Sequence, residues 1–295
     1  MSKEDDDVLN LIRNATFDVN SLNTQANRFG LGRAAIEKDF VISTILLLIS
    51  RLKEFAEYSG RMAFRGGTCI KKVYFPDETR FSEDLDFTNL SVEESNGFLE
   101  QVNRLIGRNM GVTTLERTEV LYQNERGLDF TLYYTSILQQ MNHISFNISN
   151  GSPFEETKRV KIALAPYFNE SARILTMSLR EIVAEKMRAL LQRKKPRDVF
   201  DIWFLMHEKE VRLDKDILRK KLQRSYDASP LGKRKDAKKY LMREVVSVIR
   251  DSITEKSWNN ELGGLIMRPR PERGVVVEVV CDILYEMGDI SLEAP

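Results

Sequence analysis

The order of apolar and polar positions in the first part of the chain predicts alternating helices and strands. Residues 33–55 predict one long, largely buried helix. The stretch "RMAFRG" predicts a short strand, and "GTCIKKVYF" predicts the start of a helix. In "DLDFTNL" the alternation predicts a second strand, with Asp84 and Asp86 together on one face.

Strand signals continue after a helix predicted near residues 92–106 and then almost stop. Four runs rich in β-branched and aromatic residues predict strands over residues 112–122, 128–134, 143–149 and 160–165. Beyond Leu179 the pattern predicts helices, apart from the ambiguous stretch "GVVVEVV". We therefore predict an α+β fold, with a mixed-sheet domain over residues 1–172 and a helical domain over residues 173–295.

Composition narrows the class of protein. A hydrophobic content of 42% and a charged content of 30% are typical of a globular protein, and the acidic start "MSKEDDDVLN" does not resemble a signal peptide. The longest apolar run is too short to cross a bilayer. Two cysteines far apart and only two histidines argue against a disulfide framework, a zinc site and a histidine-based relay. We expect a cytoplasmic protein that does not bind membranes.

The first candidate site is a pair of glycines where a strand meets a helix. Gly66 and Gly67 would expose backbone N–H groups at the positive end of the helix dipole, which suits a phosphate group. Thr68 is predicted either to cap the helix or to add a hydroxyl. A plain strand-to-helix turn is the alternative for the glycine pair taken alone.

The second candidate site is the aspartate pair that follows. Two carboxylates on one strand face repel each other, so Asp84 and Asp86 favour a bound cation such as Mg²⁺. A solvated strand edge is the alternative reading of the pair. Ser82 and Glu83 supply further oxygen atoms immediately before it.

The helical half contains a lysine on an apolar helix face. In "LREIVAEKMRALLQR" the apolar face contains Lys186, whereas the opposite face is polar and includes Glu181 and Glu185. Because burying an unpaired ammonium is costly, Lys186 should meet a carboxylate or phosphate, or else extend toward solvent. Asp198 and Asp201 share a face of the next helix, in "KKPRDVFDIWFL", and are its expected partners when no nucleotide is bound. Compensation of the helix dipole is the alternative role for Asp198.

Together these stretches resemble a known family. "GGT" followed by "RFSEDLDF", with "IEKDFVISTILLLI" upstream, resembles the AbiEii/AbiGii abortive-infection toxins of the polymerase β-like nucleotidyltransferase superfamily. The resemblance implies that a nucleoside triphosphate is the substrate and that the paired aspartates hold two Mg²⁺ ions. It assigns nucleotide binding to Gly66, Gly67, Thr68, Ser82 and Lys186, metal binding to Asp84 and Asp86, and catalysis to Asp84, Asp86, Lys186, Asp198 and Asp201.

The resemblance also implies a biological role. It predicts the toxin of a toxin–antitoxin or phage-defence pair, held in check by a cognate antitoxin. Some family members add nucleotides to the 3′ end of transfer RNA and so stop translation. Nucleotide transfer to a protein side chain, and nucleotide binding with little catalysis, remain open as alternatives.

Three further residues and one basic segment bear on this prediction. Asn147 aligns with the third carboxylate of the superfamily but cannot act as a general base, and Asp129 is the alternative. Lys38 in the upstream helix is expected to form a structural salt bridge. Residues 219–243 contain ten Lys or Arg and two acidic residues, which predicts either a surface for RNA or a solvated helix and loop.

Overall fold

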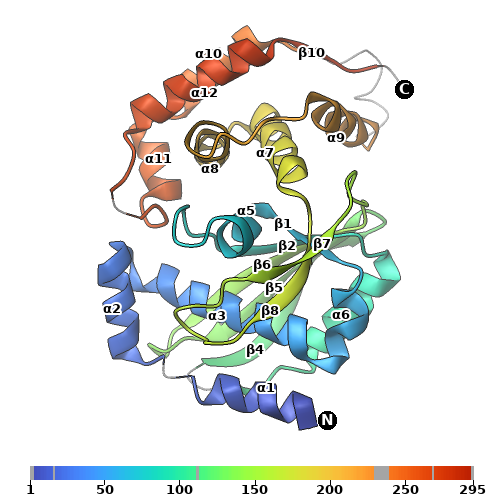
Figure 1. The fold of residues 1–295 in the computed structure, drawn as a ribbon, viewed down its shortest axis with the longest axis vertical. Helices are drawn as coiled ribbons and strands as arrows, with labels where there is room; N and C mark the ends of the chain where they lie inside the picture. Colours follow the sequence, from blue (N-terminus) through green and yellow to red (C-terminus); the bar gives the residue numbers. More distant parts are fainter. Residues whose placement is uncertain (1–2, 16, 111–112, 229–238, 268, 294–295) are drawn as a thin grey trace. The chain divides into compact units, whose positions relative to one another are not determined.

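The chain folds into two compact units, Met1–Met177 and Ser178–Pro295 (Figure 1). The computed structural model describes residues 3–15, 17–110, 113–228, 239–267 and 269–293. The predicted combination of a mixed sheet with helices is confirmed. The units divide after Met177, beyond the predicted boundary at residue 172, because β8 (Ala172–Thr176) belongs to the sheet of the first unit.

A mixed sheet forms the centre of the first unit. Over the described residues it has eight strands in the order β3-β4-β5-β6-β2-β1-β8-β7, in which β2 pairs parallel to β6, β1 pairs parallel to β8, and the other neighbours are antiparallel. The strands are β1 (Ala63–Arg65), β2 (Asp84–Thr88), β3 (Asn109–Met110), β4 (Thr113–Asn124), β5 (Gly127–Thr135), β6 (Met141–Ser149), β7 (Lys158–Ile162) and β8 (Ala172–Thr176).

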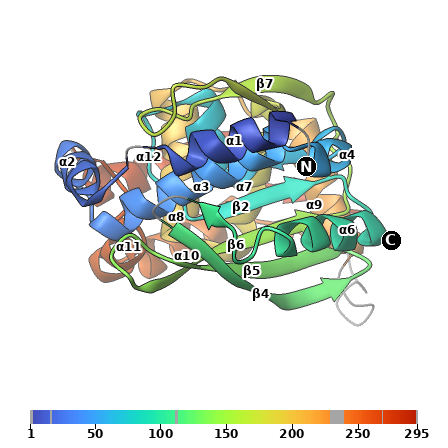
Figure 2. The same cartoon turned by 90° about the horizontal axis from the view of Figure 1, so that it is seen from below.

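Helices cover the apolar face of this sheet. Figure 2 shows α1, α3 and α6 on the face turned to the viewer. The apolar side chains of this face alternate with more polar ones along β2, β5 and β6, and the rings of Phe130 and Phe146 stack at 4.5 Å between centroids. The helical segments are α1 (Lys3–Arg13), α2 (Val19–Phe29), α3 (Arg33–Arg51), a 3₁₀ turn (Lys53–Phe55), α4 (Ala56–Ser59), α5 (Gly66–Cys69), a π-helical segment (Ile70–Tyr74) and α6 (Val92–Asn103).

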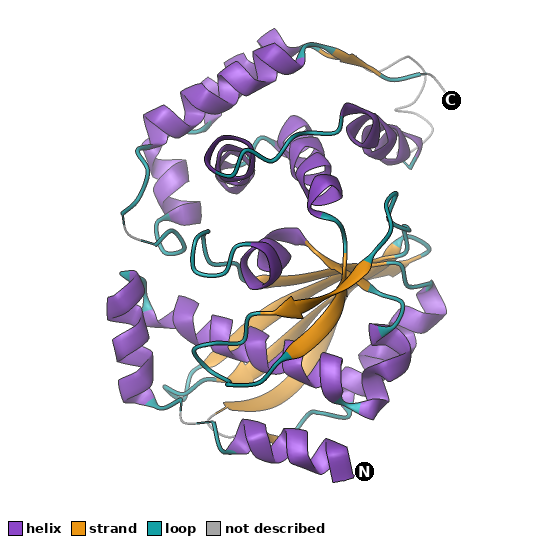
Figure 3. Cartoon of the chain, in the orientation of Figure 1, coloured by secondary structure: helices purple, strands orange, loops and turns teal. Residues whose placement is uncertain are grey.

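Over its described residues, the second unit is helical apart from two short strands (Figure 3). Its elements are α7 (Leu179–Arg193), α8 (Pro196–Ile202), a π-helical segment (Trp203–Glu208), α9 (Lys215–Asp227), β9 (Lys239–Tyr240), α10 (Met242–Ser252), α11 (Glu255–Leu262), α12 (Arg273–Met287) and β10 (Ile290–Ser291). The ambiguous stretch "GVVVEVV" lies in α12. It is helical because its buried residues recur at three- and four-residue spacing, from Val276 and Val277 to Val280 and Leu284.

The structure differs from the sequence prediction at several elements. The long helix α3 ends at Arg51, four residues before the predicted end, and a 3₁₀ turn follows. Strand β8 was not predicted, because its five residues alternate too briefly to stand out, yet it pairs with β1 at the centre of the unit. The predicted strand over residues 112–122 is β4 in the described part of the chain.

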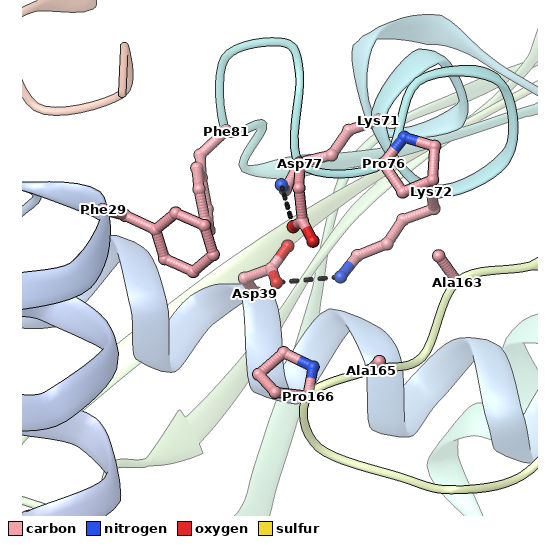
Figure 4. Close-up of a pocket in the computed structure, with 10 residues that line it drawn as sticks. All are labelled: Phe29, Asp39, Lys71, Lys72, Pro76, Asp77, Phe81, Ala163, Ala165 and Pro166. Atoms are coloured by element: carbon pink, nitrogen blue, oxygen red, sulfur yellow. Dashed lines mark hydrogen bonds and ion pairs between the residues drawn. The ribbon is translucent and has the colours of Figure 1, made fainter. Parts of the chain in front are cut away.

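A buried ion pair fixes α3 to the helical segment that carries the glycine pair. Lys72 Nζ lies 2.8 Å from Asp39 Oδ2 and 2.9 Å from Ser43 Oγ, and both charged side chains are buried. The neighbouring Lys71 is equally buried, but its nearest carboxylate oxygen, on Asp77, is 4.0 Å away (Figure 4). Its ammonium instead lies 3.8 Å from the centroid of the Phe81 ring. Burial lowers the pKa of Lys71 to about 8.

These adjacent lysines are predicted to affect stability in opposite directions. In the unfolded chain Lys71 stays charged to about pH 10.5, but in the folded protein only to about pH 8, so below pH 8 its burial opposes folding. The shift in pKa corresponds to about 3 kcal/mol of unfolding free energy lost through burial of the charge. Substitution would recover this energy but would also remove a cation–π contact worth about 1 kcal/mol. Lys71→Met should therefore raise the free energy of unfolding at pH 7 by roughly 1–2 kcal/mol, measured by chemical denaturation.

We expect the free energy of unfolding of the parent protein to rise between about pH 8 and about pH 10.5, and Lys71→Met should reduce that rise. Lys72→Met is the matched control, because it leaves Asp39 buried without its ion-pair partner and should cost about 3–5 kcal/mol. A Lys71→Met protein that is less stable at pH 7 and keeps the parent's pH dependence would contradict this account.

Candidate active site

The glycine turn begins where β1 ends. Gly66 has a φ of +80°, which is in the left-handed region, and a Cβ atom placed there would lie 2.1 Å from Asp86 Oδ2. Any larger residue would therefore be strained and would collide with that carboxylate. The backbone of the turn thus packs directly against one of the two predicted metal ligands.

Two further side chains lie against the second glycine. A Cβ at Gly67 would lie 2.9 Å from Ser82 Oγ and 3.0 Å from a terminal nitrogen of Arg80. Arg80 is buried and donates a hydrogen bond of 3.0 Å to the carbonyl of Phe81. Sequence reasoning singled out Ser82 but missed Arg80, although both lie in the quoted stretch "RFSEDLDF". The turn therefore combines backbone N–H groups, a hydroxyl and a guanidinium, all of which suit phosphate oxygens.

Thr68 does not cap the helix, and its hydroxyl bonds within the protein. Its hydroxyl donates a hydrogen bond to the backbone carbonyl of Asp84, and the residue is buried. The residue that precedes α5 is Arg65, and no side chain caps the helix there. Thr68 thus ties the glycine turn to the strand that carries the aspartates.

The aspartate pair lies on β2 as the alternation predicted. Asp84 and Asp86 are half-buried, whereas Leu85 and Phe87 are buried on the opposite face. Mg²⁺ in nucleotide sites usually takes one or two carboxylates together with waters and substrate phosphates, and this pair fits that requirement. Among the described residues, no group of three or more His, Cys, Asp or Glu side chains could hold a metal ion.

A row of polar side chains crosses the sheet at Asp86. Arg65 on β1 pairs in register with Asp86, which pairs with Asn147 on β6, which in turn pairs with Asp129 on β5. An Arg65 terminal nitrogen donates to Asn147 Oδ1, and Asn147 Nδ2 donates to Asp129 Oδ1 at 2.6 Å. Although Asp129 lies on an earlier strand in the sequence, its strand is the direct neighbour of β6.

The upstream helix contributes supporting contacts. Lys38 Nζ lies 3.0 Å from Glu83 Oε1, which is the structural salt bridge expected from the sequence. Glu37 accepts a hydrogen bond from the backbone N–H of Ile137, and burial raises the pKa of its carboxyl. Helix α3 therefore contacts the residue just before Asp84 and the turn that follows β5.

In the second unit, Lys186 forms a buried ion pair. Its Nζ lies 2.8 Å from Asp201 Oδ2, and the two side chains are 9% and 3% exposed. Asp198 is fully buried and accepts two hydrogen bonds from Arg193, at 2.6 and 2.7 Å. The structure thus separates the two aspartates that the sequence could not rank: one faces Lys186, and the other joins the end of α7 to the start of α8.

The polar face predicted for α7 is buried in part. Lys221 Nζ lies 2.9 Å from Glu181 Oε1 and 3.0 Å from Glu185 Oε2, and Glu181 has no exposed surface. The correction follows from α9, which packs against this face and which the helical period of α7 alone does not reveal. Lys221 is therefore part of a buried cluster and not of the basic surface predicted over residues 219–243.

The centre of that predicted basic surface, residues 229–238, lies outside the described residues. Among the described residues of the second unit, a groove of about 470 Å³ lies among α7, α9, β9 and α10. Lys194 and Lys239 line this groove together with Tyr240 and apolar residues of α10.

Comparison with known proteins identifies the family. A family profile for "Nucleotidyl transferase AbiEii toxin, Type IV TA system" matches residues 48–275, which is more than half of the chain. The chain belongs to the AbiEii family of nucleotidyltransferase toxins. The family resemblance found in the sequence and the prediction of nucleotidyltransferase activity are thereby confirmed. A search of curated proteins gives no match.

Solved structures show that the AbiEii-family toxin shares its fold with other proteins. The nucleotidyltransferase toxin MenT4 from Mycobacterium tuberculosis H37Rv has a TM-score of 0.60 at 18% identity, over 86% of this chain and 85% of that one. JHP933 from Helicobacter pylori has a TM-score of 0.52 at 16% identity, over 87% and 94%. In the part of the AbiEii-family toxin that the structure describes, no helix is long and apolar enough to cross a membrane.

Proposed function

We propose that this AbiEii-family toxin is a cytoplasmic, Mg²⁺-dependent enzyme that transfers nucleotides from a nucleoside triphosphate to the 3′ end of transfer RNA and so blocks translation. The observation that best supports this proposal is the close approach of the Gly66 turn to the Asp86 carboxylate. The backbone N–H groups of such a turn suit the phosphates, and paired carboxylates suit the cation that accompanies them. One site thus offers both parts that a triphosphate substrate needs.

The residues of the first unit have distinct roles in this proposal. The N–H groups of the glycine turn, the Ser82 hydroxyl and the Arg80 guanidinium bind phosphate oxygens. Asp84 and Asp86 hold the metal, which when bound neutralises triphosphate charge and lowers the pKa of the attacking hydroxyl. Thr68 keeps the turn and the carboxylates in register through the Asp84 carbonyl.

In the second unit we propose that Lys186 and Asp201 act as a functional pair. A lysine that meets phosphate stabilises the negative charge that grows on the departing pyrophosphate. Asp201 pairs with the ammonium and orients it when no nucleotide is bound. Asp198 is the weaker candidate for catalysis, since Arg193 already occupies both of its oxygens.

The choice of RNA as acceptor is supported by basic residues in the second unit. Besides the buried Lys221, residues 219–243 carry nine Lys or Arg. Lys194 and Lys239 line the groove among α7, α9, β9 and α10, together with one acidic residue, Glu244. Local clusters of this kind attract phosphate backbones even when the whole chain is nearly neutral, as it is here with a net charge of +1. Family membership adds a cognate antitoxin as a further partner.

Incubation with labelled nucleoside triphosphates, Mg²⁺, total RNA and cell lysate tests the proposal. We expect label in transfer RNA, and none when the RNA 3′ end has been blocked chemically. Asp84→Ala should abolish labelling because one metal ligand is lost, and Gly66→Ala should reduce it strongly because the new Cβ meets Asp86. Label in protein would support side-chain modification instead. Labelling by Asp84→Ala at the parent's rate would contradict the metal assignment.

A second prediction separates the catalytic role of Lys186 from its structural one. Lys186→Met should abolish labelling and also lower stability by about 3–5 kcal/mol, because the buried Asp201 then loses the ammonium that balances its charge. Lys186→Met combined with Asp201→Asn should recover most of that stability, since the buried charge is gone. Transfer should remain absent in the double variant. Recovery of transfer together with stability would show that the pair only holds α7 against α8.

A further inference from the structure

The polar row that crosses the sheet at Asp86 is built from four adjacent strands. Arg65, Asp86, Asn147 and Asp129 stand in one register on β1, β2, β6 and β5. Residues directly paired across neighbouring strands point to the same face, so all four side chains share the face that carries the aspartate pair. The covered apolar face is formed by their sequence neighbours, such as Leu85 and Phe146.

Arg65 is anchored within this row at two points. Its Nε donates to the backbone carbonyl of Phe87 at 3.2 Å, and a terminal nitrogen donates to Asn147 Oδ1. A guanidinium is planar and always charged, so two such bonds fix both its position and its plane. Because Arg65 is also the residue just before Gly66, this anchor fixes the entrance of the glycine turn.

Asn147 connects Arg65 to Asp129 through one hydrogen bond that it accepts and one that it donates. Its oxygen accepts from Arg65, and its nitrogen donates to Asp129 Oδ1 at 2.6 Å. A carboxylate at position 147 could still accept from Arg65 but could not donate to Asp129. It would instead place two like charges within hydrogen-bond distance of each other. The amide is therefore required by its neighbours in the sheet.

From this arrangement we infer that Arg65, held by Asn147 and Asp129, is a positioning residue of the transferase, and that Asn147 is a connector and not a metal ligand. The fixed guanidinium sets the glycine turn and the Asp86 carboxylate in one geometry for the metal and the triphosphate. The inference rests on the proposed function, because it assigns Arg65 a task in the same site.

The test exchanges the two residues that form the hydrogen bond between Asn147 and Asp129. Asn147→Asp should lower kcat by about tenfold or more, because it removes a hydrogen bond and sets two carboxylates together. Asp129→Asn should lower kcat by less than about threefold, since an amide oxygen can still accept from Asn147. The double exchange, Asn147→Asp with Asp129→Asn, restores one donor facing one acceptor and leaves Arg65 with an acceptor. It should return kcat to within about threefold of the parent value.

Two outcomes would overturn the inference. If Asn147 were a metal ligand, Asn147→Asp alone would keep or raise activity and lower the Mg²⁺ concentration needed for half-maximal rate. If the row were merely structural, the unfolding midpoints of the variants would follow the exchange, but the kcat of each well-folded variant would stay within about threefold of the parent value.

A second readout keeps this inference separate from the proposed function. The rise in unfolding temperature caused by Mg²⁺ with a non-hydrolysable nucleoside triphosphate is measured without any acceptor. It should be small for Asn147→Asp and recover in the double exchange. A parent protein that gains stability from the nucleotide but labels no RNA would defeat the proposed acceptor and leave the inference standing. Equal stabilisation of all four proteins would defeat the inference.

Discussion

A backbone turn that lies against a carboxylate organises the first unit of this toxin. Gly66 can approach Asp86 only because it lacks a Cβ atom, and its φ of +80° is a conformation that other residues rarely adopt. That approach places a patch of backbone donors beside a pair of acidic acceptors. The parts nearby serve to keep the two together: the Thr68 hydroxyl bonds to the carbonyl of Asp84, and α3 is tied to the same helical segment through Asp39 and Lys72.

Buried charges are the second recurring feature, and nearly all of them have partners. Asp39 with Lys72 and Lys186 with Asp201 are close buried pairs, and the buried Asp198 pairs with the partly exposed Arg193. Pairs of this kind add little net stability but become costly when one partner is removed. They therefore fix where helices meet, which is what a site made from several elements requires. Lys71 differs, because its burial is matched only by aromatic rings and a distant carboxylate.

The sequence predicted those features that depend on local periodicity. Alternation alone put Asp84 and Asp86 on one face, and the helical period alone put Lys186 among apolar residues, where burial requires a partner. The register between distant strands is not a local property. No pattern in the sequence shows that Asn147 lies between Arg65 and Asp129, nor that Glu181 faces α9 and not solvent. Arg80 stands in the quoted stretch "RFSEDLDF", but its closeness to Gly67 is a tertiary contact that no local pattern shows.

The central claim is that the glycine turn and the aspartate pair form one nucleotide and metal site. The most direct measurement is a crystal structure of the protein with Mn²⁺ and a non-hydrolysable nucleoside triphosphate, with the metal located by its anomalous scattering. The account predicts a metal peak bound by Asp84 and Asp86, with triphosphate oxygens within hydrogen-bond distance of the N–H groups of Gly66 and Gly67. A metal bound elsewhere, or a triphosphate remote from the glycine turn, would contradict it.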